Sequence, residues 1–244
     1  MEYVVIILNY MTIYTMNNIS LYGHVTTDTI LDGDISYKSV GGVGNIWSTL
    51  SKICPDYQVS VEPTNIGEAL ILVNKEKAER ASIANLNLKN RTPIIRESSW
   101  SHILYINELD DLSFIKEARK KSNIISTDIC KGRVLKDLSV LKYIDYFFIS
   151  DEDLFMDMNE LASKVRGWVI LHDKGGSTCM NCERSFNIKM PVIDNINVLG
   201  AGDMFAAAVM STILNNVENF DLENNIKEAH TITSKLLAEI NEKN

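Results

Sequence analysis

The sequence has no cluster of basic residues and no apolar segment long enough to cross a bilayer. Its 24 lysines and arginines are outnumbered by 32 aspartates and glutamates, which gives a net charge of −8. Nucleic-acid-binding proteins carry a basic surface, so we expect no nucleic-acid partner. The apolar run at residues 3–14 is too short for a transmembrane helix, is interrupted by Asn9, and is not preceded by the basic residues of a signal peptide. We therefore expect no membrane partner.

Cysteine is also scarce, with four scattered residues in 244. This usage is typical of a protein in the reducing cytoplasm and does not fit a disulfide framework. Cys179 and Cys182 form an isolated C-x-x-C pair within residues 177–188, which we predict to be a β-hairpin. A zinc site needs a second pair, and a redox motif needs a helix that starts after a strand. We interpret the pair as incidental to the hairpin, in preference to a metal or redox site.

The composition is that of a globular protein, since 45% of the residues are hydrophobic. The length suits one sizeable α/β core or two small domains, and no internal repeat or long linker interrupts it. From residue 102 onward, short apolar segments alternate with segments of helical periodicity, which indicates a parallel sheet covered on both faces. The predicted strands are 18–23, 59–61, 68–74, 92–96, 102–106, 123–127, 145–149 and 168–171, and the predicted helices are 111–121, 134–142, 151–165, 203–214 and 222–242.

Ligands of such a sheet gather at the carboxyl ends of its strands. Asp128, Ser150 and His172 fall at such ends.

The most informative segment is a glycine-rich turn that leads into a helix rich in alanine and methionine. Gly200, Ala201 and Gly202 precede Asp203 and the predicted helix. The first N–H groups of a helix lack intrahelical partners, and glycine lets an anion approach the backbone closely. A carboxylate beside an anion site repels phosphate, so its presence there favours a chemical role. One such role is to take a proton from an attacking alcohol. The alternative is a helix start in which Asp203 only complements the helix dipole.

This segment closely resembles the signature of the ribokinase-like (PfkB) carbohydrate kinases. Gly200, Ala201, Gly202 and Asp203 match it fully, whereas Asn197 and Val198 stand where the family has Asp-Thr. The resemblance implies that the Gly-Ala-Gly backbone binds the transferred phosphoryl group and that Asp203 is the catalytic base. It also implies a three-layer α/β/α fold with a mostly parallel central sheet and a small β-lid.

A second glycine motif lies near the amino terminus. Gly41, Gly42 and Asn45 match the family's second signature, which opens a helix against the sugar, in a shorter-spaced form. Asp28 falls where the family has an aspartate that binds substrate hydroxyl groups, after a first strand that ends in Gly23. Without the resemblance, Asp28 would be read as a turn former. The two signatures occur in the family's order and imply a substrate site built from these four residues.

The resemblance also implies residues that contact nucleotide and metal. Ser150 and Asp153 occupy the place of the family's Asn-x-x-Glu element, which assists Mg²⁺ and phosphate binding, although both also fit a simple acidic helix start. His172 replaces a common glycine of the strand and turn beside the nucleotide; a histidine there is more often structural. The remaining residues of that turn, Lys174, Gly175 and Gly176, are in place.

The resemblance divides the chain into an extension of uncertain role, residues 1–15, and a kinase domain, residues 16–244. The lid is expected within residues 30–42 and 58–97 and includes a charged turn at 74–80. The alternative is a surface sheet in which that turn is only a solvated tip. The lid would exclude water from the reaction, and it is a candidate homodimer surface. The family continues beyond its closing helix to a further strand. Because this sequence ends at Asn244, we expect a shallower nucleotide pocket and leave the nucleotide preference open.

We therefore predict a cytoplasmic enzyme that phosphorylates a hydroxyl of a small carbohydrate-like substrate, with ATP and Mg²⁺. Two alternatives stay open. The first is a family member that has lost catalysis and binds nucleotide or sugar as a regulator, which the substitutions at Asn197, Ser150 and His172 favour. The second is a nucleoside kinase on the same scaffold.

Overall fold

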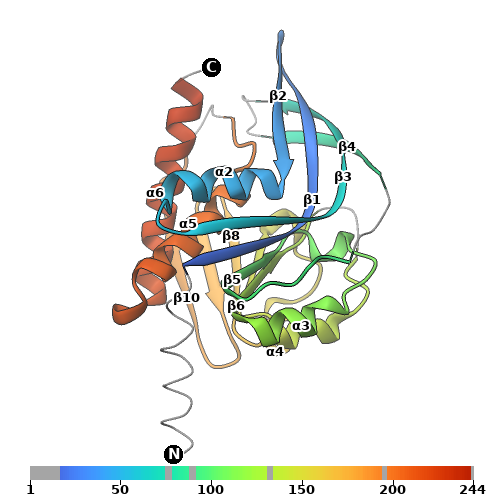
Figure 1. Ribbon diagram of the computed structural model, residues 1–244. Helices are drawn as coiled ribbons and strands as arrows, with labels where there is room; N and C mark the ends of the chain where they lie inside the picture. Colours follow the sequence, from blue (N-terminus) through green and yellow to red (C-terminus); the bar gives the residue numbers. More distant parts are fainter. Residues whose placement is uncertain (1–16, 75–78, 88–91, 131–133, 194–196, 243–244) are drawn as a thin grey trace, which may run out of the picture.

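The computed structural model describes residues 17–74, 79–87, 92–130, 134–193 and 197–242, and it is built around one large twisted sheet (Figure 1). The strands follow the order β10-β9-β8-β7-β6-β5-β1-β3-β4, and β2 pairs with β1. Pairing is parallel from β3 through β1, β5, β6 and β7 to β8 and antiparallel at both edges. The bounds are β1 Asn18–Asp32, β2 Ile35–Gly42, β3 Gln58–Asn74, β4 Glu79–Asn87, β5 Ser98–Ile103, β6 Ser122–Asp128, β7 Tyr146–Ser150, β8 Trp168–Asp173, β9 Gly176–Met180 and β10 Ser185–Lys189.

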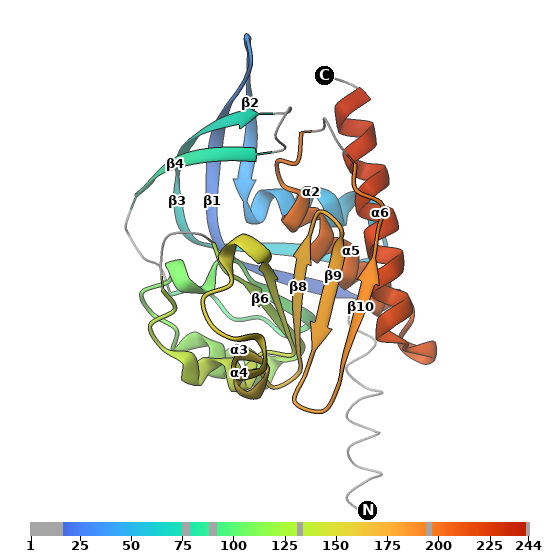
Figure 2. The same cartoon turned by 180° about the vertical axis from the view of Figure 1, so that it is seen from behind.

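Helices cover both faces of the parallel part of the sheet, as strand–helix alternation predicts. One face carries α2, α5 and α6, and the other carries α3 and α4 (Figures 1 and 2). Each layer closes over its own hydrophobic cluster, one around Trp100 and Phe205 and the other around Phe147 and Ile115. The α-helices are α2 Val43–Ile53, α3 Phe114–Lys121, α4 Met158–Lys164, α5 Ala201–Asn215 and α6 Leu222–Glu242, with short 3₁₀ helices η1 Ile106–Glu108, η2 Leu138–Tyr143, η3 Asp151–Asp153 and η4 Val217–Asn219.

A second, smaller β-layer grows out of the same strands. The first strand does not end at Gly23, as expected, but continues to Asp32, with an irregularity between Gly23 and His24 where its pairing with β3 shifts by one residue. The far halves of β1 and β3 pair with β2 and β4 to form a wall that stands over one end of the main sheet (Figure 2). Asp28 therefore lies in the wall, and its strand is rooted in the core.

Other sequence predictions about elements were also wrong. Residues 92–96 are irregular rather than a strand, and residues 134–142 form only the 3₁₀ helix η2. The single helix predicted at 151–165 is broken into η3 and α4, because Asp157 caps a new helix by accepting hydrogen bonds from the N–H groups of Asn159 and Glu160. The expected extension at 1–15 and most of the charged turn at 74–80 lie outside the described residues.

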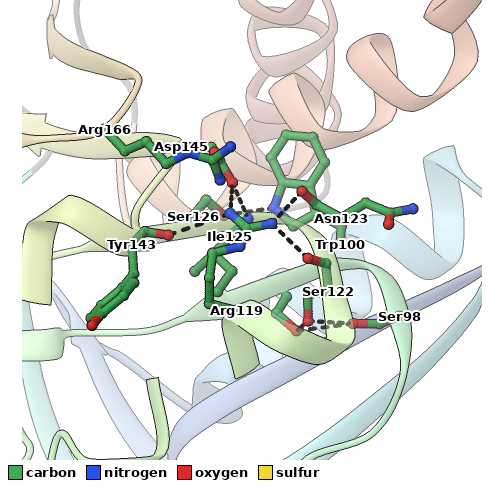
Figure 3. A network of polar contacts seen from close by, with 11 residues as sticks. Ser98, Trp100, Arg119, Ser122, Asn123, Ile125, Ser126, Tyr143, Asp145 and Arg166 are labelled. Atoms are coloured by element: carbon green, nitrogen blue, oxygen red, sulfur yellow. Dashed lines mark hydrogen bonds and ion pairs between the residues drawn. The ribbon is translucent and has the colours of Figure 1, made fainter. Parts of the chain in front are cut away.

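A polar network fixes the amino-terminal edge of the parallel strands (Figure 3). The Arg119 guanidinium, at the end of α3, contacts the Asp145 carboxylate and the carbonyl oxygens of Ser122 and Asn123. Asp145 also accepts a hydrogen bond from the N–H of Ile125 at 2.8 Å and pairs with Arg166 at 3.1 Å. These bonds hold β6 and β7 together at the edge opposite the glycine motifs.

Within the described part of the chain, no helix is both long and apolar enough to cross a membrane.

Candidate active site

The two glycine motifs, which lie far apart in the sequence, meet at the start of α5. Asp203 is 6% exposed and is the third residue of α5. The side-chain amide of Asn45, in the first turn of α2, donates a hydrogen bond of 2.8 Å to Oδ2 of Asp203. An amide donor and the amino-terminal end of a helix both stabilise the charged form of a buried carboxylate. The structure thus presents an oriented carboxylate beside the glycine turn.

The glycine turn has the left-handed conformation that its sequence requires. Gly200 has φ of 76° and precedes the first helical residue, and a Cβ on it would lie 3.8 Å from the Asn45 amide nitrogen. A Cβ on Gly202 would lie 3.4 Å from the His172 ring. The N–H of Ala201 donates to the carbonyl of Val198 at 3.0 Å, so in this conformation it does not point to a ligand. Gly202 follows it in the first turn, where the backbone N–H has no intrahelical acceptor.

Asp28 and Gly41 are brought together by the pairing of β1 with β2. A Cβ on Gly41 would lie 2.0 Å from an Asp28 carboxylate oxygen, so a larger residue there would displace that carboxylate. Asp28 is 6% exposed, and its Oδ1 has no hydrogen-bond partner within the described structure. Gly42, with φ of 62°, turns the chain into α2 against the carbonyl of His24. A buried carboxylate oxygen without a donor is costly, which marks Asp28 as a group that a hydroxyl-bearing ligand would satisfy.

His24 and Asp128 belong to the same end of the sheet, and sequence reasoning gave neither of them a role. Burial lowers the pKa of His24, while the charges of Glu108, Asp128 and Asp28 act in the opposite direction. Asp128 ends β6 and accepts a hydrogen bond of 2.5 Å from the N–H of Tyr105. For both residues the available signal was the place directly after a predicted strand, 18–23 for His24 and 123–127 for Asp128.

The candidate metal ligand Asp153 lies in η3, directly after β7. Ser150 donates a hydrogen bond of 2.7 Å to its Oδ2, and its Oδ1 is buried without a partner in the described structure. The described residues contain no cluster of three or more histidine, cysteine, aspartate or glutamate side chains arranged to hold a metal ion. One oriented carboxylate fits Mg²⁺, because this ion usually binds through one or two carboxylates, water and phosphate oxygens.

His172 belongs to a row of aromatic rings that connects β8 with α5 and α6. Its ring centroid lies 5.4 Å from that of Phe205, and the Phe205 ring stacks on His230 at 4.4 Å. His230 also forms a hydrogen bond of 3.0 Å with the Ser177 hydroxyl. Burial lowers the pKa of both histidines to about 4, so both are neutral at pH 7. A neutral imidazole beside Gly202 offers a hydrogen bond to a phosphate without adding a fixed charge.

The remaining predicted nucleotide residues, Lys174 and the two glycines after it, form the turn between β8 and β9. The N–H of Gly175 donates to the Asp173 carboxylate at 2.6 Å. Gly176 has φ of 134°, and a Cβ on it would lie 1.9 Å from the carbonyl oxygen of Ile188. The pairing of β9 with β10 therefore requires Gly176 to be glycine, whether or not a ligand binds nearby.

No family model matches this chain, and no curated protein does. Solved structures do match along almost its whole length. A pyrophosphate-dependent kinase in the ribokinase family, solved as a sulfate complex, is 18% identical, with 90% of this chain and 95% of that chain covered and a TM-score of 0.64. A ribokinase from Thermotoga maritima is 18% identical, with 88% and 92% covered and a TM-score of 0.62. A ribokinase from Giardia lamblia is 13% identical, with 88% and 90% covered and a TM-score of 0.66.

These similarities confirm the predicted fold. The chain has the α/β/α ribokinase fold, which it shares with sugar kinases of the ribokinase family at low sequence identity.

Proposed function

We propose that this protein is a carbohydrate kinase that transfers the γ-phosphoryl group of ATP to a hydroxyl of a small carbohydrate-like substrate. One observation carries the proposal: a buried aspartate, oriented by Asn45, stands three residues after a left-handed glycine at the start of α5. A general base and an anion-binding backbone thus lie side by side. The shared fold adds support, because the ribokinase-family structures of that fold include sugar kinases.

Phosphoryl transfer needs little covalent chemistry from the protein, so orientation and charge are its main contributions. Asp203 takes the proton of the acceptor hydroxyl, while the hydroxyl oxygen forms a bond to the γ-phosphorus. The bond from that phosphorus to the oxygen that bridges it to the β-phosphate breaks, and ADP is released. Gly200, Ala201 and Gly202 bind the transferred group through backbone N–H groups. For Ala201 this role requires its bond to Val198 to open.

The acceptor is held opposite the base. Asp28 offers Oδ1, which has no hydrogen-bond partner among the described residues, to substrate hydroxyl groups, and Gly41 and Gly42 keep the backbone close enough for contact. Asn45 joins the two halves, because it binds Asp203 and lies on the helix that Gly42 begins. An acceptor with several hydroxyl groups suits this arrangement better than an apolar one.

The donor side consists of Ser150, Asp153, His172 and the turn from Lys174 to Gly176. Asp153 would hold Mg²⁺ with the help of water and phosphate oxygens, and the ion would neutralise charge on the phosphates. His172 would contact the phosphates through its ring. Residues of the turn would lie along the nucleotide.

Pyrophosphate is a second candidate donor. One of the similar structures is a pyrophosphate-dependent kinase in the ribokinase family. A second similar structure of such a kinase contains a pyrophosphate analog and myo-inositol. Both donors present the same terminal phosphoryl group to the glycine turn, so the chemistry at Asp203 is common to them.

We also propose that two copies associate through the outer face of the β-wall. Strand register places five exposed apolar side chains on one face, with Leu70 directly opposite Ile83. The opposite face carries buried residues such as Asp28 and Ile30. Exposed apolar side chains gathered on one face of a sheet favour an interaction surface. Its residues are Val40, Ile66, Leu70, Leu72 and Ile83, each at least 42% exposed.

The deciding experiment measures phosphoryl transfer from ATP–Mg²⁺ and from pyrophosphate–Mg²⁺ to a panel of sugars, polyols, sugar phosphates and nucleosides. We expect turnover with at least one polyhydroxylated acceptor. Asp203→Asn should lower kcat on the order of 10²–10⁴-fold, because the amide has nearly the same shape but cannot accept a proton. Donor affinity should be retained or improved, since one negative charge near the phosphates is gone.

Each contrary result has a definite meaning. If Asp203→Asn keeps turnover within a few-fold of wild type, Asp203 is not the base. If the wild type binds donor but transfers nothing to the whole panel, the non-catalytic regulator replaces the kinase. Transfer to nucleosides alone would assign the chain to the nucleoside kinases.

A further inference from the structure

The segment before the glycine turn is tied to the far end of the last helix. Asn197 is 3% exposed and lies three residues before Gly200. In the resemblance to the PfkB signature this is one of the two positions, with Val198, that depart from the family pattern. Its main-chain and side-chain groups are both engaged, and their partners come from α6, from the glycine-turn segment itself and from the β-wall.

Asn241, in the last turn of α6, binds both main-chain groups of Asn197. Its Oδ1 accepts a hydrogen bond of 2.7 Å from the Asn197 N–H, and its Nδ2 donates one of 3.2 Å to the Asn197 carbonyl. The same Nδ2 donates to the Leu237 carbonyl at 2.8 Å, which fixes the side chain on its own helix. One amide thus pairs with the backbone as a neighbouring strand would, although 44 residues separate the two positions.

The Asn197 side chain passes this restraint on to the turn and to the wall. Its Oδ1 accepts a hydrogen bond of 2.9 Å from the N–H of Leu199, which bends the chain toward Gly200. Its Nδ2 donates to the Tyr37 hydroxyl on β2 at 3.4 Å. The next bond, from the Ala201 N–H to Val198, leads into the first turn of α5.

We propose that Asn241 is a positioning residue for phosphoryl transfer: it holds the segment 197–199, and through it the glycine turn, in register with Asp203. This inference rests on the proposed function. Without the amide, the buried N–H and carbonyl of Asn197 lose their partners, and the turn has no other side-chain restraint from α6 among the described residues. A displacement of about 1 Å at a reacting group costs on the order of 10²-fold in rate.

Two substitutions separate the two bonds. Asn241→Leu has nearly the same size and can make neither, whereas Asn241→Asp keeps the acceptor for the Asn197 N–H but cannot donate to its carbonyl. Glu242→Leu is the matched control, because it changes the neighbouring exposed residue and leaves the hydrogen bonds between Asn241 and Asn197 intact.

We expect Asn241→Leu to lower kcat about 10- to 100-fold with the acceptor KM changed less than about threefold, and Asn241→Asp to lower it less. Hydrogen exchange in peptides covering 197–204 should become about tenfold faster or more in Asn241→Leu. The affinity for pyrophosphate–Mg²⁺, measured by calorimetry, should fall in parallel. Glu242→Leu should match wild type in all three measurements.

The proposal is overturned if exchange in 197–204 is unchanged in Asn241→Leu, or if exchange rises while turnover and pyrophosphate affinity stay at wild-type values. If the leucine variant does not fold, the same criteria apply to Asn241→Asp. A wild type that neither transfers phosphoryl groups nor binds ATP or pyrophosphate contradicts the proposed function instead. In that case the positioning role is also overturned, even if hydrogen exchange shows that Asn241 restrains residues 197–204.

Discussion

At the scale of single residues, the site is defined by two buried carboxylates in different states of satisfaction. Asp203 receives a hydrogen bond from Asn45, whereas Oδ1 of Asp28 has no donor among the described residues. A satisfied carboxylate is held in place, and an unsatisfied one gains free energy when a ligand supplies a hydroxyl. In the proposed function, the pair therefore separates orientation of the base from recognition of the acceptor.

Asp28→Asn should weaken acceptor binding while leaving donor binding nearly unchanged. Loss of a charge-assisted hydrogen bond costs roughly 1.5–3 kcal/mol, which corresponds to about 10- to 150-fold in Kd. Calorimetry with the acceptor found in the panel measures this change. Asp34→Asn, at the exposed turn of the same hairpin, is the control. An unchanged acceptor affinity in Asp28→Asn would remove Asp28 from the site.

The sequence predicted some of these residues and could not predict others. Asn45 and Asp203 were both predicted site residues because each belongs to a glycine motif, and the structure shows that they touch. Asn241 left no signal, because an amide that pairs with a distant backbone requires neither a motif nor a spacing. His24 was missed for a different reason: the first strand was predicted to end at Gly23, so the position of His24 within a longer β1 was not foreseen.

At the scale of elements, the ring row between β8, α5 and α6 makes stability depend on pH. The folded-state pKa values of His172 and His230, about 4, lie below the ordinary value of 6.5. Between these values the unfolded chain binds protons that the folded chain does not. Stability should therefore be complete above about pH 6.5 and should fall as the pH drops toward 4.

Urea denaturation between pH 7.5 and 4.5 measures this dependence. The double variant His172→Gln with His230→Gln should show a shallower loss of stability on acidification, although it starts from a lower value. Equal slopes for the variant and wild type would mean that the two histidines do not control the dependence of stability on pH.

The β9–β10 hairpin explains the two cysteines without a metal or redox site. Cys179 is buried on β9 and Cys182 is exposed in the connection, and both are free thiols. Burial raises the pKa of Cys179 to about 12, so it is a poor nucleophile. We expect an added disulfide reagent to modify Cys182 quickly and Cys179 only on unfolding, and Cys179→Ala with Cys182→Ser to keep activity. Stoichiometric zinc in the wild type, lost in the double variant, would contradict this.

Element prediction from the sequence was accurate where the pattern was repetitive. The hairpin, the central strands and the last helix were located within a few residues. The predicted helix at 151–165 was wrong because Asp157 caps the start of α4 and so interrupts the helical periodicity that runs across it. The extension of β1 past Gly23 was missed because a glycine inside a strand and a glycine at its end look the same in sequence.

At the scale of the whole molecule, the outer face of the wall exposes five large apolar side chains: Val40, Ile66, Leu70, Leu72 and Ile83. Leu70→Asp with Ile83→Asp places two like charges at its centre, so the double variant should be monomeric if wild type is a dimer in sedimentation velocity at tens of micromolar. Ile35→Asp, which changes an exposed isoleucine on the other face of β2, should remain dimeric. A monomeric wild type would contradict the proposed association.

The continuity of β1 from the core into the wall has a mechanical consequence. From Gly23 to Asp32 the strand extends roughly 30 Å, at about 3.3 Å per residue, beyond the irregularity beside His24. A rotation of roughly ten degrees about that irregularity would carry the tip about 5 Å and Asp28 about half as far. Under the proposed role of Asp28, binding of the acceptor and closure of the wall would therefore be a single motion.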